Sequence, residues 1–567
     1  MRSRLSLAAA VSGLIAVALA TSAIPGGNSA TADVLDPNNT ANIQILSIND
    51  LHGNLEPPAG SSGRVGTINA GGAEYLATHV RNLKNTNKNT LIVSAGDLIG
   101  ASPLLSALFD DEPTIDVASA IGVDMAGVGN HEFDRGVAEL KRIDKGGCKP
   151  NVRCQNGIWQ GSPFPFIAAN VLDTKSGQTI LPAWYYRDLD GVRVGFIGLT
   201  LKDTPTIVTP SGVAGLEFKD EVEVINSNAA ILRQRGANAI VVAIHQGGRG
   251  ATGAPNECKD FTGPIIDIVK KTSKIVDAYL TAHTHEGYNC IIDGKPVMQG
   301  ASFGRLVTKL DLVVQRGQDG RVVSAKATNV IVTRDVPKAA DITTIIDKYK
   351  RLSAPRANRV LGSIAATFDR VSSAGGETTL GDLIADSQLA ATRDAALGGA
   401  QVALMNPGGI RTDLVYEQIS GGEATGQVTY AEAFAVQPFG NNLMTITVTG
   451  AQLKTVLEQQ FDNPTPGTQR ILQVSKGFTY TYSKSAPLGS KVDASSIKID
   501  GKVVDPATKY RITVNSFLAD GGDSFLELAK GTERLGGAVD IDALEKYLIS
   551  LGTPAALPTL DRIVIKP

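Results

Sequence analysis

The chain has 567 residues, of which 43% are hydrophobic and 19% are charged, and its formal net charge is −2. This length allows two or three domains with well-filled cores, and the globular composition excludes a wholly disordered chain. A net charge so close to zero provides no large positive field for nucleic-acid polymers or anionic membranes. Any phosphate group that the protein binds must therefore be held by a local site.

The first residues have the pattern of an export signal. Arg2 and Arg4 precede an apolar run from Leu5 to Ala20, and the small residues Ala30-Thr31-Ala32 offer a cleavage site. A membrane anchor is the alternative, but the run is short and gives way to Gly, Ser and Asn. We therefore expect a signal peptide over 1–32 and a secreted product, held at most loosely at the cell surface and without a stable membrane anchor.

Four cysteines are expected to form disulfides in such an oxidising destination. Cys148 and Cys154 flank a short polar loop, and Cys258 and Cys290 bracket a longer segment. Three pairings are possible, and we favour the local pairs 148–154 and 258–290 because they need the least chain reorganisation. A cysteine-based zinc site is the alternative, but these spacings are not those of a zinc ribbon.

Apolar and β-branched runs alternate with helix-like stretches through the first half of the chain. We predict strands at Ile43–Ile48, Leu91–Ser94, Val192–Leu199, Ala239–Ile244 and Ala278–Thr281, and helices at Ala73–Leu83, Glu221–Arg235 and Pro264–Thr272. This alternation is typical of an α/β domain built on sheets.

The sequence pattern changes after Asp335. Ala339–Leu352 has helical spacing with several Lys and Arg residues, which predicts a linker helix between two domains. Further on we predict helices at Leu380–Thr392 and Ala451–Phe461, and strands at Val402–Met405, Leu443–Val448 and Tyr510–Asn515. The predicted organisation is a signal peptide (1–32), a first domain (33–335), a linker helix (336–360) and a smaller α+β domain (361–567).

Five of the six histidines lie in short polar clusters at the ends of predicted strands. The side chains that could act as ligands or catalysts there are Asp50, His52, Asp97, Asn130, His131, Asp134, His245, His283 and His285. Open α/β folds place their sites beyond the carboxyl ends of strands. Asp50 and His52, like His283 and His285, are two residues apart, which on an extended segment turns both side chains to one side. His79, on a predicted helix, is expected to be structural.

The ligand types indicate metal ions. Oxygen and nitrogen ligands without a thiolate suit Zn²⁺, Mn²⁺ or Fe, and make a calcium cage improbable. Buried polar groups are costly without partners, and metal ions would satisfy all of them together. Two ions about 3.5–4 Å apart need a bridging carboxylate, which Asp97 could supply, and such a pair lowers the pKa of bound water from about 15.7 towards 7. We therefore expect two divalent ions that produce hydroxide at neutral pH.

The segments "NDLHGNL", "SAGDLIGASP", "GVGNHEFDRG", "AIHQGG" and "AHTHEG", in this order, resemble the calcineurin-like metallophosphoesterases. The most similar branch is the secreted 5′-nucleotidase family, which includes bacterial UDP-sugar hydrolases and cyclic-nucleotide phosphodiesterases. The resemblance implies a sandwich of two sheets flanked by helices. It also implies two metal sites, one formed by Asp50, His52, Asp97 and His285, the other by Asp97, Asn130, His245 and His283.

His131 and Asp134 match the catalytic pair of this family. A histidine beside the metals can donate hydrogen bonds to phosphoryl oxygens as charge builds, and Asp134 could keep its imidazole oriented and protonated. The alternative for Asp134 is a turn or helix-capping role, and Glu132 is expected to be structural. The family's usual glycine before the paired histidines is Ala282 here, which should not disturb the ligands.

Three Gly-rich clusters mark the second domain: "NPGGIRTD", "QPFGNNL" and "NSFLADGGDSF". Each could be only a turn, since Asn, Asp and Gly favour left-handed backbone. Each also carries a residue suited to a nucleotide: Arg411 for a phosphate, Phe439 and Phe517 for a base, and Asp523 for ribose hydroxyls. The clusters resemble the nucleotide-binding loops of the 5′-nucleotidase C-terminal domain. This implies that the two phenylalanines sandwich the base, that Asp523 contacts the ribose, and that Asn406 and Arg411 help to hold the substrate.

One departure widens the expected substrate range. Some family members carry a further arginine just before the segment "GETTLGDL", where this chain has Ala374-Gly375-Gly376. The prediction is therefore a secreted hydrolase, monomeric or dimeric, that removes phosphate from small nucleotides by attack of metal-bound hydroxide. A broader nucleotide phosphodiesterase or pyrophosphatase (acting on UDP-sugars or 2′,3′-cyclic nucleotides) is the first alternative, and a non-catalytic exported binding protein of the same fold is the second.

Overall fold

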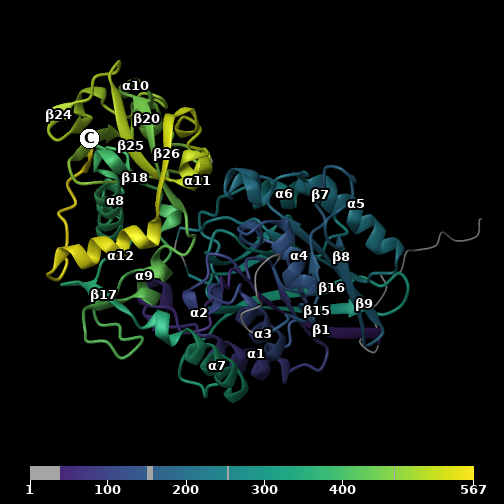
Figure 1. The fold of residues 1–567 in the computed structure, drawn as a ribbon. Coiled ribbons are helices and arrows are strands. Elements are labelled where there is room, and N and C mark those ends of the chain that lie inside the picture. The colour runs from purple at the N-terminus through teal and green to yellow at the C-terminus, as the bar shows by residue number, and fades with distance from the viewer. Residues whose placement is uncertain (1–38, 150–156, 252–253, 465, 567) are drawn as a thin grey trace, which may run out of the picture. The chain divides into compact units, whose positions relative to one another are not determined.

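The computed structural model describes residues 39–149, 157–251, 254–464 and 466–566. Contacts divide the chain into two compact units, Met1–Asn39 and Thr40–Pro567, and the second unit is described below (Figure 1). The signal peptide expected over 1–32 and Cys154 of the first expected disulfide both lie outside the described residues. Within the described ranges, no helix has the length and apolarity needed to cross a membrane.

The first half of the second unit contains two six-stranded sheets. The first sheet has the order β16 (Val322–Ile331), β15 (Leu306–Gln315), β1 (Thr40–Ile48), β4 (Thr90–Ser94), β5 (Met125–Gly127) and β6 (Phe166–Ile167). The second sheet has the order β13 (Gly287–Ile292), β14 (Lys295–Gly300), β12 (Ala278–Thr281), β11 (Ala239–His245), β9 (Val192–Thr200) and β8 (Trp184–Leu189). Both sheets are mixed. In the first, β1, β4, β5 and β6 are parallel, and β15 and β16 add antiparallel pairs at one edge. In the second, β9, β11, β12 and β14 are parallel, and β8 and β13 pair antiparallel at the two edges.

The two sheets pack face to face around a shared core. Ile45 and Val93 from the first sheet lie in one buried cluster with Phe196 and Val241 from the second. Helices α1 (Ala73–Lys84), α2 (Leu104–Ala107), α3 (Glu112–Ile121), α4 (Val137–Lys145) and α7 (Ala340–Ala357) pack on the outer side of the first sheet, and α5 (Glu221–Gln234) and α6 (Ile265–Lys271) on that of the second. The expected sandwich of two sheets flanked by helices is therefore confirmed.

The remaining part of the unit is a smaller α+β arrangement. Its five-stranded sheet has the order β21 (Gln473–Val474), β18 (Val402–Met405), β25 (Lys509–Asn515), β20 (Asn442–Thr449) and β26 (Thr532–Val539), and a four-stranded sheet has the order β24 (Lys502–Val503), β23 (Lys498–Ile499), β22 (Phe478–Ser483) and β27 (Ile563–Lys566). The helices are α8 (Thr379–Thr392), α9 (Tyr430–Val436), α10 (Gly450–Glu458), α11 (Ser516–Ala519) and α12 (Asp540–Leu551). Helix α7 occupies most of the predicted linker, while the domain boundaries themselves stay a prediction.

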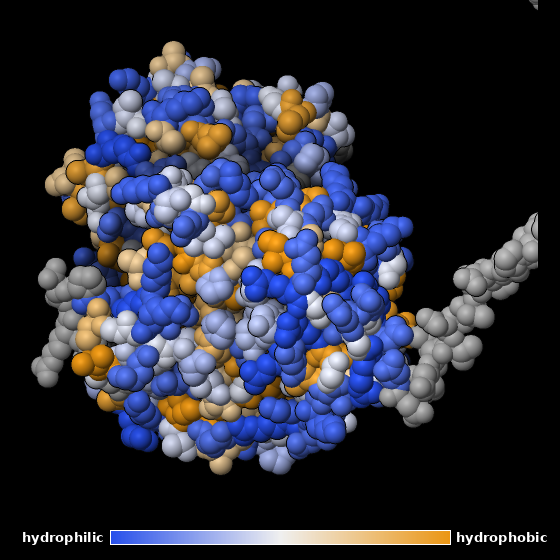
Figure 2. All heavy atoms as spheres, turned by 90° about the vertical axis from the view of Figure 1, so that its right-hand side faces the viewer, coloured by the Kyte–Doolittle hydropathy of each residue, from blue (hydrophilic) through white to orange (hydrophobic). Residues whose placement is uncertain are grey.

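Short two-stranded ladders complete the described structure. They are formed by β2 (Arg64–Val65) with β3 (Ile68–Asn69), β7 (Val171–Asp173) with β10 (Leu216–Phe218), and β17 (Val360–Ser363) with β19 (Gln427–Thr429). A disulfide joins Cys258 to Cys290, which lies within the edge strand β13. Hydrophilic side chains cover much of the face that Figure 2 shows, and hydrophobic side chains gather in small groups between them.

Candidate metal centre

The candidate ligands follow the ends of strands that run parallel to one another. Asp50 and Asp97 come after β1 and β4, which are parallel neighbours in the first sheet, and Asn130 comes after β5 beside them. His245 is the last residue of β11 and His283 follows β12, its parallel neighbour in the second sheet. The carboxyl ends of both sheets therefore deliver ligands to one place, as the sequence pattern predicted for an α/β fold.

The backbone at the ligands differs from the prediction. Asp50 (φ 48°), His52 (φ 47°), His283 (φ 75°) and His285 (φ 59°) are all left-handed rather than extended, as is Asp97 (φ 51°). The sequence analysis expected the side chains of each pair to point to one side because they alternate along an extended segment. That reason was wrong, because the backbone of these residues is not extended. Left-handed backbone is uncommon for residues other than glycine, and it persists where surrounding contacts hold it in place.

Backbone hydrogen bonds hold these left-handed turns. The amide of Asp50 donates to the carbonyl of Gly96 at 3.0 Å, and the amide of His52 donates to the carbonyl of Asp97 at 3.0 Å. The amide of Phe303 donates to the carbonyl of Asp50 at 2.7 Å. The loops after β1 and β4 are thereby tied to each other, which fixes where their side chains lie.

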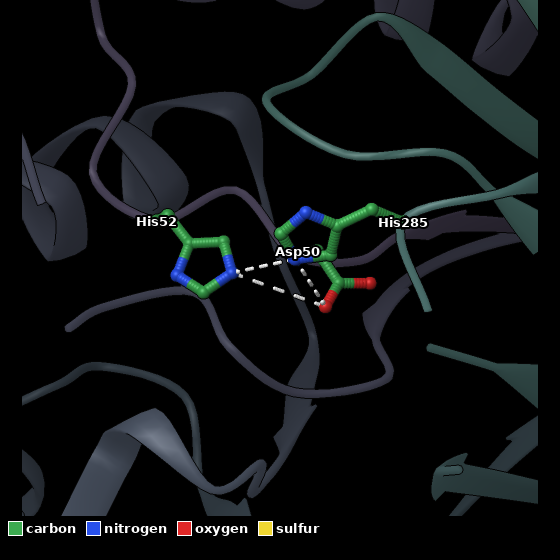
Figure 3. A group of neighbouring side chains, drawn as sticks. All are labelled: Asp50, His52 and His285. Carbon is green, nitrogen blue, oxygen red and sulfur yellow. Dashed lines mark hydrogen bonds and ion pairs between the residues drawn. The ribbon is translucent and has the colours of Figure 1, made fainter. Parts of the chain in front are cut away.

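Asp50, His52 and His285 form the first group of converging ligand atoms (Figure 3). The Nε2 atoms of His52 and His285 lie 3.0 Å apart. Oδ1 of Asp50 lies 3.5 Å from Nε2 of His285 and 4.0 Å from Nε2 of His52. Two imidazole nitrogens and a carboxylate oxygen therefore face a common point.

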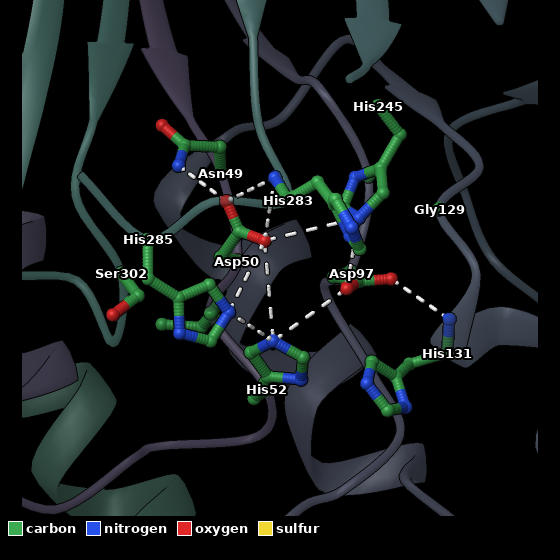
Figure 4. Close-up of polar contacts among 12 residues, drawn as sticks. Asn49, Asp50, His52, Asp97, Gly129, His131, His245, His283, His285 and Ser302 are labelled. Carbon is green, nitrogen blue, oxygen red and sulfur yellow. Dashed lines mark hydrogen bonds and ion pairs between the residues drawn. The ribbon is translucent and has the colours of Figure 1, made fainter. Parts of the chain in front are cut away.

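Asp50 and Asp97 also converge with His245 (Figure 4). Oδ2 of Asp97 lies 2.9 Å from Nε2 of His245 and 3.6 Å from Nε2 of His52. Oδ1 of Asp50 lies 3.8 Å from Nε2 of His245. Because one oxygen of Asp97 is close to a histidine of each group, this carboxylate has the position that a bridging ligand requires.

Asn130 and His283 lie beside the second group. Nδ1 of His283 is 3.0 Å from Oδ1 of Asn130, and the rings of His245 and His283 are 5.4 Å apart between centroids. The backbone amide of His283 donates to both carboxylate oxygens of Asp50 at 3.1 Å. All seven predicted ligands are thus brought together, whereas His79 is elsewhere, on α1, with Nε2 3.1 Å from the carbonyl oxygen of Thr333.

The donor set fits divalent cations. Asp50, His52 and His245 are fully buried, and Nε2 of His245 has no hydrogen-bond partner in suitable geometry although Asp97 is 2.9 Å away. Burial lowers the pKa of His52 well below its ordinary value, so this imidazole is neutral, which is the form that binds a metal. Burial opposes and Asp97 favours the protonation of His245, whose pKa is raised to about 9 without an ion. A cation would take the place of that proton between nitrogen and carboxylate.

Glu132 organises the backbone beneath the ligands. Its buried carboxylate accepts hydrogen bonds from the amides of Gly129 (2.6 Å), Asp97 (3.0 Å) and Ile99 (3.3 Å). The loops that follow β4 and β5 are therefore connected through one side chain. The sequence prediction treated Glu132 as structural without a specific role, and these three contacts supply the role.

His131 and Asp134 lie at the edge of the ligand cluster. Nδ1 of His131 is 2.8 Å from Oδ2 of Asp134, and its backbone amide donates to Oδ1 of Asp97 at 2.9 Å. Burial alone would lower the pKa of His131, but the carboxylates of Asp134 and Asp97 outweigh it, and the net pKa is raised. Asp134 therefore favours a protonated imidazole beside the candidate ligands.

A loop of the second half of the chain reaches the ligand cluster. Nη2 of Arg411 is 3.4 Å from Nε2 of His52, and its guanidinium lies 5.8 Å from the centre of the Phe439 ring. The Phe439 ring stacks on His131 at 5.7 Å between centroids. Two of the predicted substrate-binding residues thus meet the candidate catalytic pair and ligands directly.

The structure adds two arginines to this region. Arg305 and Arg370 are close enough for each to affect the charge of the other, and Arg370 also affects Arg411. Burial, with a contribution from Arg370, lowers the pKa of Arg305 to about 10. The sequence analysis assigned only Arg411 to a phosphate, and it missed Arg370 because "FDRV" contains nothing that distinguishes its arginine.

Asn406 and Asp523 form a separate polar group. Nδ2 of Asn406 donates to Oδ2 of Asp523 at 2.8 Å, and Nη1 of Arg470 donates to Oδ1 of Asp523 at 2.8 Å. The Phe517 ring packs closely against Gly522, the residue before Asp523: a Cβ atom at Gly522 would lie only 2.5 Å from that ring. Phe439 stacks on His131, and the predicted sandwich of a base between Phe439 and Phe517 stays a prediction.

Comparison with known families identifies the class of the protein. The pattern of the family described as "Calcineurin-like phosphoesterase" matches residues 43–287, and that of "5'-nucleotidase, C-terminal domain" matches residues 358–530. The chain therefore belongs to the calcineurin-like phosphoesterases, in the group that carries a 5′-nucleotidase C-terminal domain.

Individual proteins are similar over most of this chain. "Endonuclease YhcR" of Bacillus subtilis is 32% identical over 92% of this chain, and "Cell wall protein Lmo0130" of Listeria monocytogenes is 33% identical over 89% of it. The chain spans 41% and 66% of the lengths of these two relatives. The crystal structure of a 5′-nucleotidase precursor from Thermus thermophilus shares the fold, with a TM-score of 0.74, 24% identity, and 93% and 100% of the two chains covered.

Proposed function

We propose that the chain is a secreted hydrolase that removes phosphate from small nucleotides with the help of two divalent metal ions. The observation that carries the proposal is the meeting of two predicted sites. Arg411, from a predicted nucleotide-binding loop, lies 3.4 Å from the candidate metal ligand His52, and Phe439, from another such loop, stacks on His131. A phosphate ester held by these loops would have its phosphorus beside the ligand cluster.

Seven residues would hold the ions. Asp50, His52, Asp97 and His285 would bind one of them, and Asp97, Asn130, His245 and His283 the other, with Asp97 shared. When bound, such ions supply Lewis acidity and lower the pKa of water at the site. Zn²⁺, Mn²⁺ and Fe²⁺ all suit this mixture of imidazole, carboxylate and amide ligands.

His131 would stabilise the phosphoryl group during hydrolysis. Because the Asp134 carboxylate accepts from Nδ1, the other ring nitrogen, Nε2, is available to donate to a phosphoryl oxygen as negative charge builds there. Arg411, whose Nη2 lies 3.4 Å from Nε2 of His52, would add a second donor. Both residues would act most strongly in the transition state, which is where stabilisation accelerates a reaction.

The nucleoside would be held by Phe439, Phe517, Asp523 and Asn406. Rings of phenylalanine offer apolar faces to a base, and the carboxylate of Asp523 can accept hydrogen bonds from ribose hydroxyls. Asn406 would act through Asp523, whose Oδ2 it contacts at 2.8 Å. The family description of residues 358–530 as a 5′-nucleotidase C-terminal domain supports this assignment.

The decisive experiment is a substrate panel with controlled metal content. Purified protein is treated with a chelator and assayed with AMP, UDP-glucose and 2′,3′-cyclic AMP, before and after Zn²⁺, Mn²⁺ or Fe²⁺ is restored. We expect no turnover without metal and release of phosphate from AMP with it. If kcat/KM is higher for the diesters than for AMP, the protein is instead a phosphodiesterase. The name of the relative "Endonuclease YhcR" is the reason to test this alternative. If the metal-restored protein hydrolyses nothing, the proposal is wrong.

Secretion is the second part of the proposal. It is supported by the export pattern of the first residues, the Cys258–Cys290 disulfide and the cell-wall relative. Expression with residues 1–32 in a secreting host should place the protein in the medium with a new N-terminus near Asp33. Retention of intact Met1 inside the cells would contradict this part alone.

A further inference from the structure

A third parallel strand ends beside the metal centre without supplying a candidate ligand. Strand β14 is the parallel neighbour of β12, with Tyr279 opposite Val297 and Leu280 opposite Met298. Its carboxyl end therefore lies at the same edge of the second sheet as the ends of β11 and β12. The next residue of β14 is Gln299, which is fully buried. A buried amide is costly without hydrogen-bond partners, so the partners of Gln299 show which segment it holds.

The side-chain amide of Gln299 holds the loop that follows β12. In the amide orientation that satisfies every partner, Nε2 donates to the carbonyl oxygen of Ala282 at 2.9 Å and to the hydroxyl of Thr284 at 3.0 Å. Oε1 accepts from the backbone amide of His285 at 2.8 Å and from that of Glu286 at 3.0 Å. A primary amide has two donor hydrogens and two acceptor lone pairs, so Gln299 uses all of them on this one loop.

These bonds matter because two residues of the loop are left-handed. His283 (φ 75°) and His285 (φ 59°) have a conformation that is uncommon outside glycine and that persists only where other contacts hold it. The backbone amide of His283 is held by the carboxylate of Asp50, to which it donates at 3.1 Å. The backbone amide of His285 donates to Gln299 instead. The two histidine ligands of this loop are therefore held by different partners.

Gln299 also lies against the loop that follows β11. A Cβ atom at Gly247 would lie 2.5 Å from the side-chain amide of Gln299 and 2.5 Å from the carbonyl oxygen of Ala282. The hydroxyl of Thr284, which accepts from Gln299, donates to the carbonyl oxygen of Gly248 at 2.8 Å. Glycine at position 247 thus allows the two ligand-bearing loops of the second sheet to pack around one amide.

The residue after Gln299 reaches the first sheet. The backbone amide of Gly300 donates to Oδ1 of Asn49 at 2.9 Å, and Nδ2 of Asn49 donates to Oδ2 of Asp50 at 2.6 Å (Figure 4). Asp50 is therefore oriented by Asn49 and does not depend on the side chain of Gln299. Of the first group of ligands, His285 is the one that Gln299 contacts.

We propose that Gln299 is a positioning residue that determines how tightly the ion of the first group is bound. The inference rests on the two-ion centre of the proposed function, and it adds to that centre a residue outside the ligand set. Without the bond from its backbone amide to Gln299, His285 would lose the contact that keeps its ring towards His52, whereas His283 would keep its bond to Asp50. Residues that orient metal ligands in this way typically change metal affinity about 10–100-fold.

Metal stoichiometry tests the inference without an activity assay. Chelator-treated protein is dialysed against Mn²⁺, the bound ions are counted by atomic emission, and a spin-coupled pair of ions is recognised by electron paramagnetic resonance. Gln299→Met removes the amide and keeps a side chain of similar length. Gln473→Met is the matched control, because Gln473 is also buried and its amide also makes four hydrogen bonds, but it lies in β21, which carries no candidate ligand.

We expect the wild type and Gln473→Met to bind two ions with equal affinities. Gln299→Met should bind one ion as tightly as the wild type and the other at least about tenfold more weakly, and should lose the spin-coupled signal at the Mn²⁺ concentration that saturates the wild type. Two ions bound at wild-type affinity in folded Gln299→Met would overturn the inference and leave the proposed function intact, and equal weakening of both ions would also overturn it. A wild type that binds fewer than two ions would refute the proposed metal centre itself.

A second variant decides the matter if Gln299→Met does not fold. Thr284→Val is close in size to the native residue and removes only the hydroxyl that joins Gln299 to Gly248. We expect it to weaken the binding of one ion about threefold, as the loss of one hydrogen bond from the held loop would do. Unchanged affinity for both ions in Thr284→Val would then refute the inference.

Discussion

Nδ1 of His131 lies 2.8 Å from Oδ2 of Asp134, and the ring of the same histidine stands 5.0 Å from that of His52. A carboxylate only accepts hydrogen bonds, so Nδ1 must carry a proton in this pair. The geometry separates two functions: Asp134 orients and charges the imidazole, and the imidazole itself faces the reacting group. Substitutions of His131 and of Asp134 should therefore lower the activity by different amounts.

Removing the imidazole should cost more activity than altering its partner. We expect His131→Ala to lower kcat for AMP about 100-fold and Asp134→Asn about tenfold, with smaller changes in KM, because both act on charge that develops in the transition state. Asp203→Asn, at an exposed position, is the control and should keep the wild-type rate. A His131→Ala variant that retains half of the activity would exclude this histidine from the chemistry.

Metal binding should stabilise the folded protein as well as activate it. A ligand that binds the native state alone at 100 times its dissociation constant adds about 2.7 kcal/mol, so restoring metal to chelated protein should raise Tm by about 5 °C. His245→Ala should lose this shift, since Nε2 of His245 lies among the ligand atoms. His79→Gln, which changes a histidine of α1, should keep it. Equal shifts in both variants would mean that the ion binds elsewhere.

The sequence was sufficient to predict the ligand cluster because its histidines, aspartates and asparagine lie in short polar segments at the ends of predicted strands. Predicted strands such as Ala278–Thr281 and Val402–Met405 coincide with β12 and β18, and the clusters follow strand ends as expected. The backbone conformation at the ligands could not be read in the same way. Left-handed φ at Asp50 and His283 depends on hydrogen bonds between loops distant in sequence, and a two-residue spacing is compatible with either conformation.

Features that depend on tertiary contact were missed for the same reason. Arg370 and Arg470 sit in segments without a motif, and only the folded chain brings them to Asp413 and Asp523. The long antiparallel strands β15 and β16 were also not predicted. The alternation of β15 is plain once its buried and half-exposed residues are known, but β16 carries mainly short and polar side chains that resemble a loop.

Glu132 should be essential for the arrangement of the ligands. Its carboxylate serves three buried backbone amides, and each amide left without a partner costs about 1–3 kcal/mol. Glu132→Ala should therefore lower the free energy of unfolding by more than about 2 kcal/mol and weaken metal binding through Asp97. Chemical denaturation and metal titration measure the two effects. Glu217→Gln, at an exposed ion pair with Lys219, should change neither, and normal metal affinity in folded Glu132→Ala would contradict the assigned role.

Arg470 should position Asp523 for a ribose. The left-handed backbone of Asp523 (φ 55°) is strained, and Arg470 fixes one of its oxygens at 2.8 Å. Arg470→Met should raise KM for AMP about fivefold with little change in kcat, and should affect 2′,3′-dideoxy-AMP much less, because that analogue lacks the hydroxyls that Asp523 would accept. Arg534→Met removes an exposed arginine paired with Asp520 and serves as the control. Equal effects on both nucleotides would indicate a purely structural arginine.

Asp382, which is not part of the metal centre, should make the free energy of unfolding depend on pH. It is fully buried on α8, with Arg562 Nε 3.2 Å from Oδ2 but outside hydrogen-bond geometry. Burial raises its pKa to about 9, with Arg562 opposing and Glu377 adding to the shift. An unfolded aspartate has a pKa of about 3.9, so the unfolded state releases this proton first as the pH rises. The contribution of Asp382 is therefore fully present below about pH 4 and is lost progressively up to about pH 9.

The variant Asp382→Asn isolates this contribution because an amide imitates the neutral acid and cannot ionise. Denaturant unfolding at pH 5 and pH 8 should show the variant gaining stability relative to the wild type as the pH rises, since only the wild type must retain a proton at Asp382 or bury a charge. Asp505→Asn, at an exposed turn, should follow the wild type at both values. If the difference between Asp382→Asn and the wild type is the same at both pH values, Asp382 is already ionised in the folded protein and Arg562 alone neutralises it.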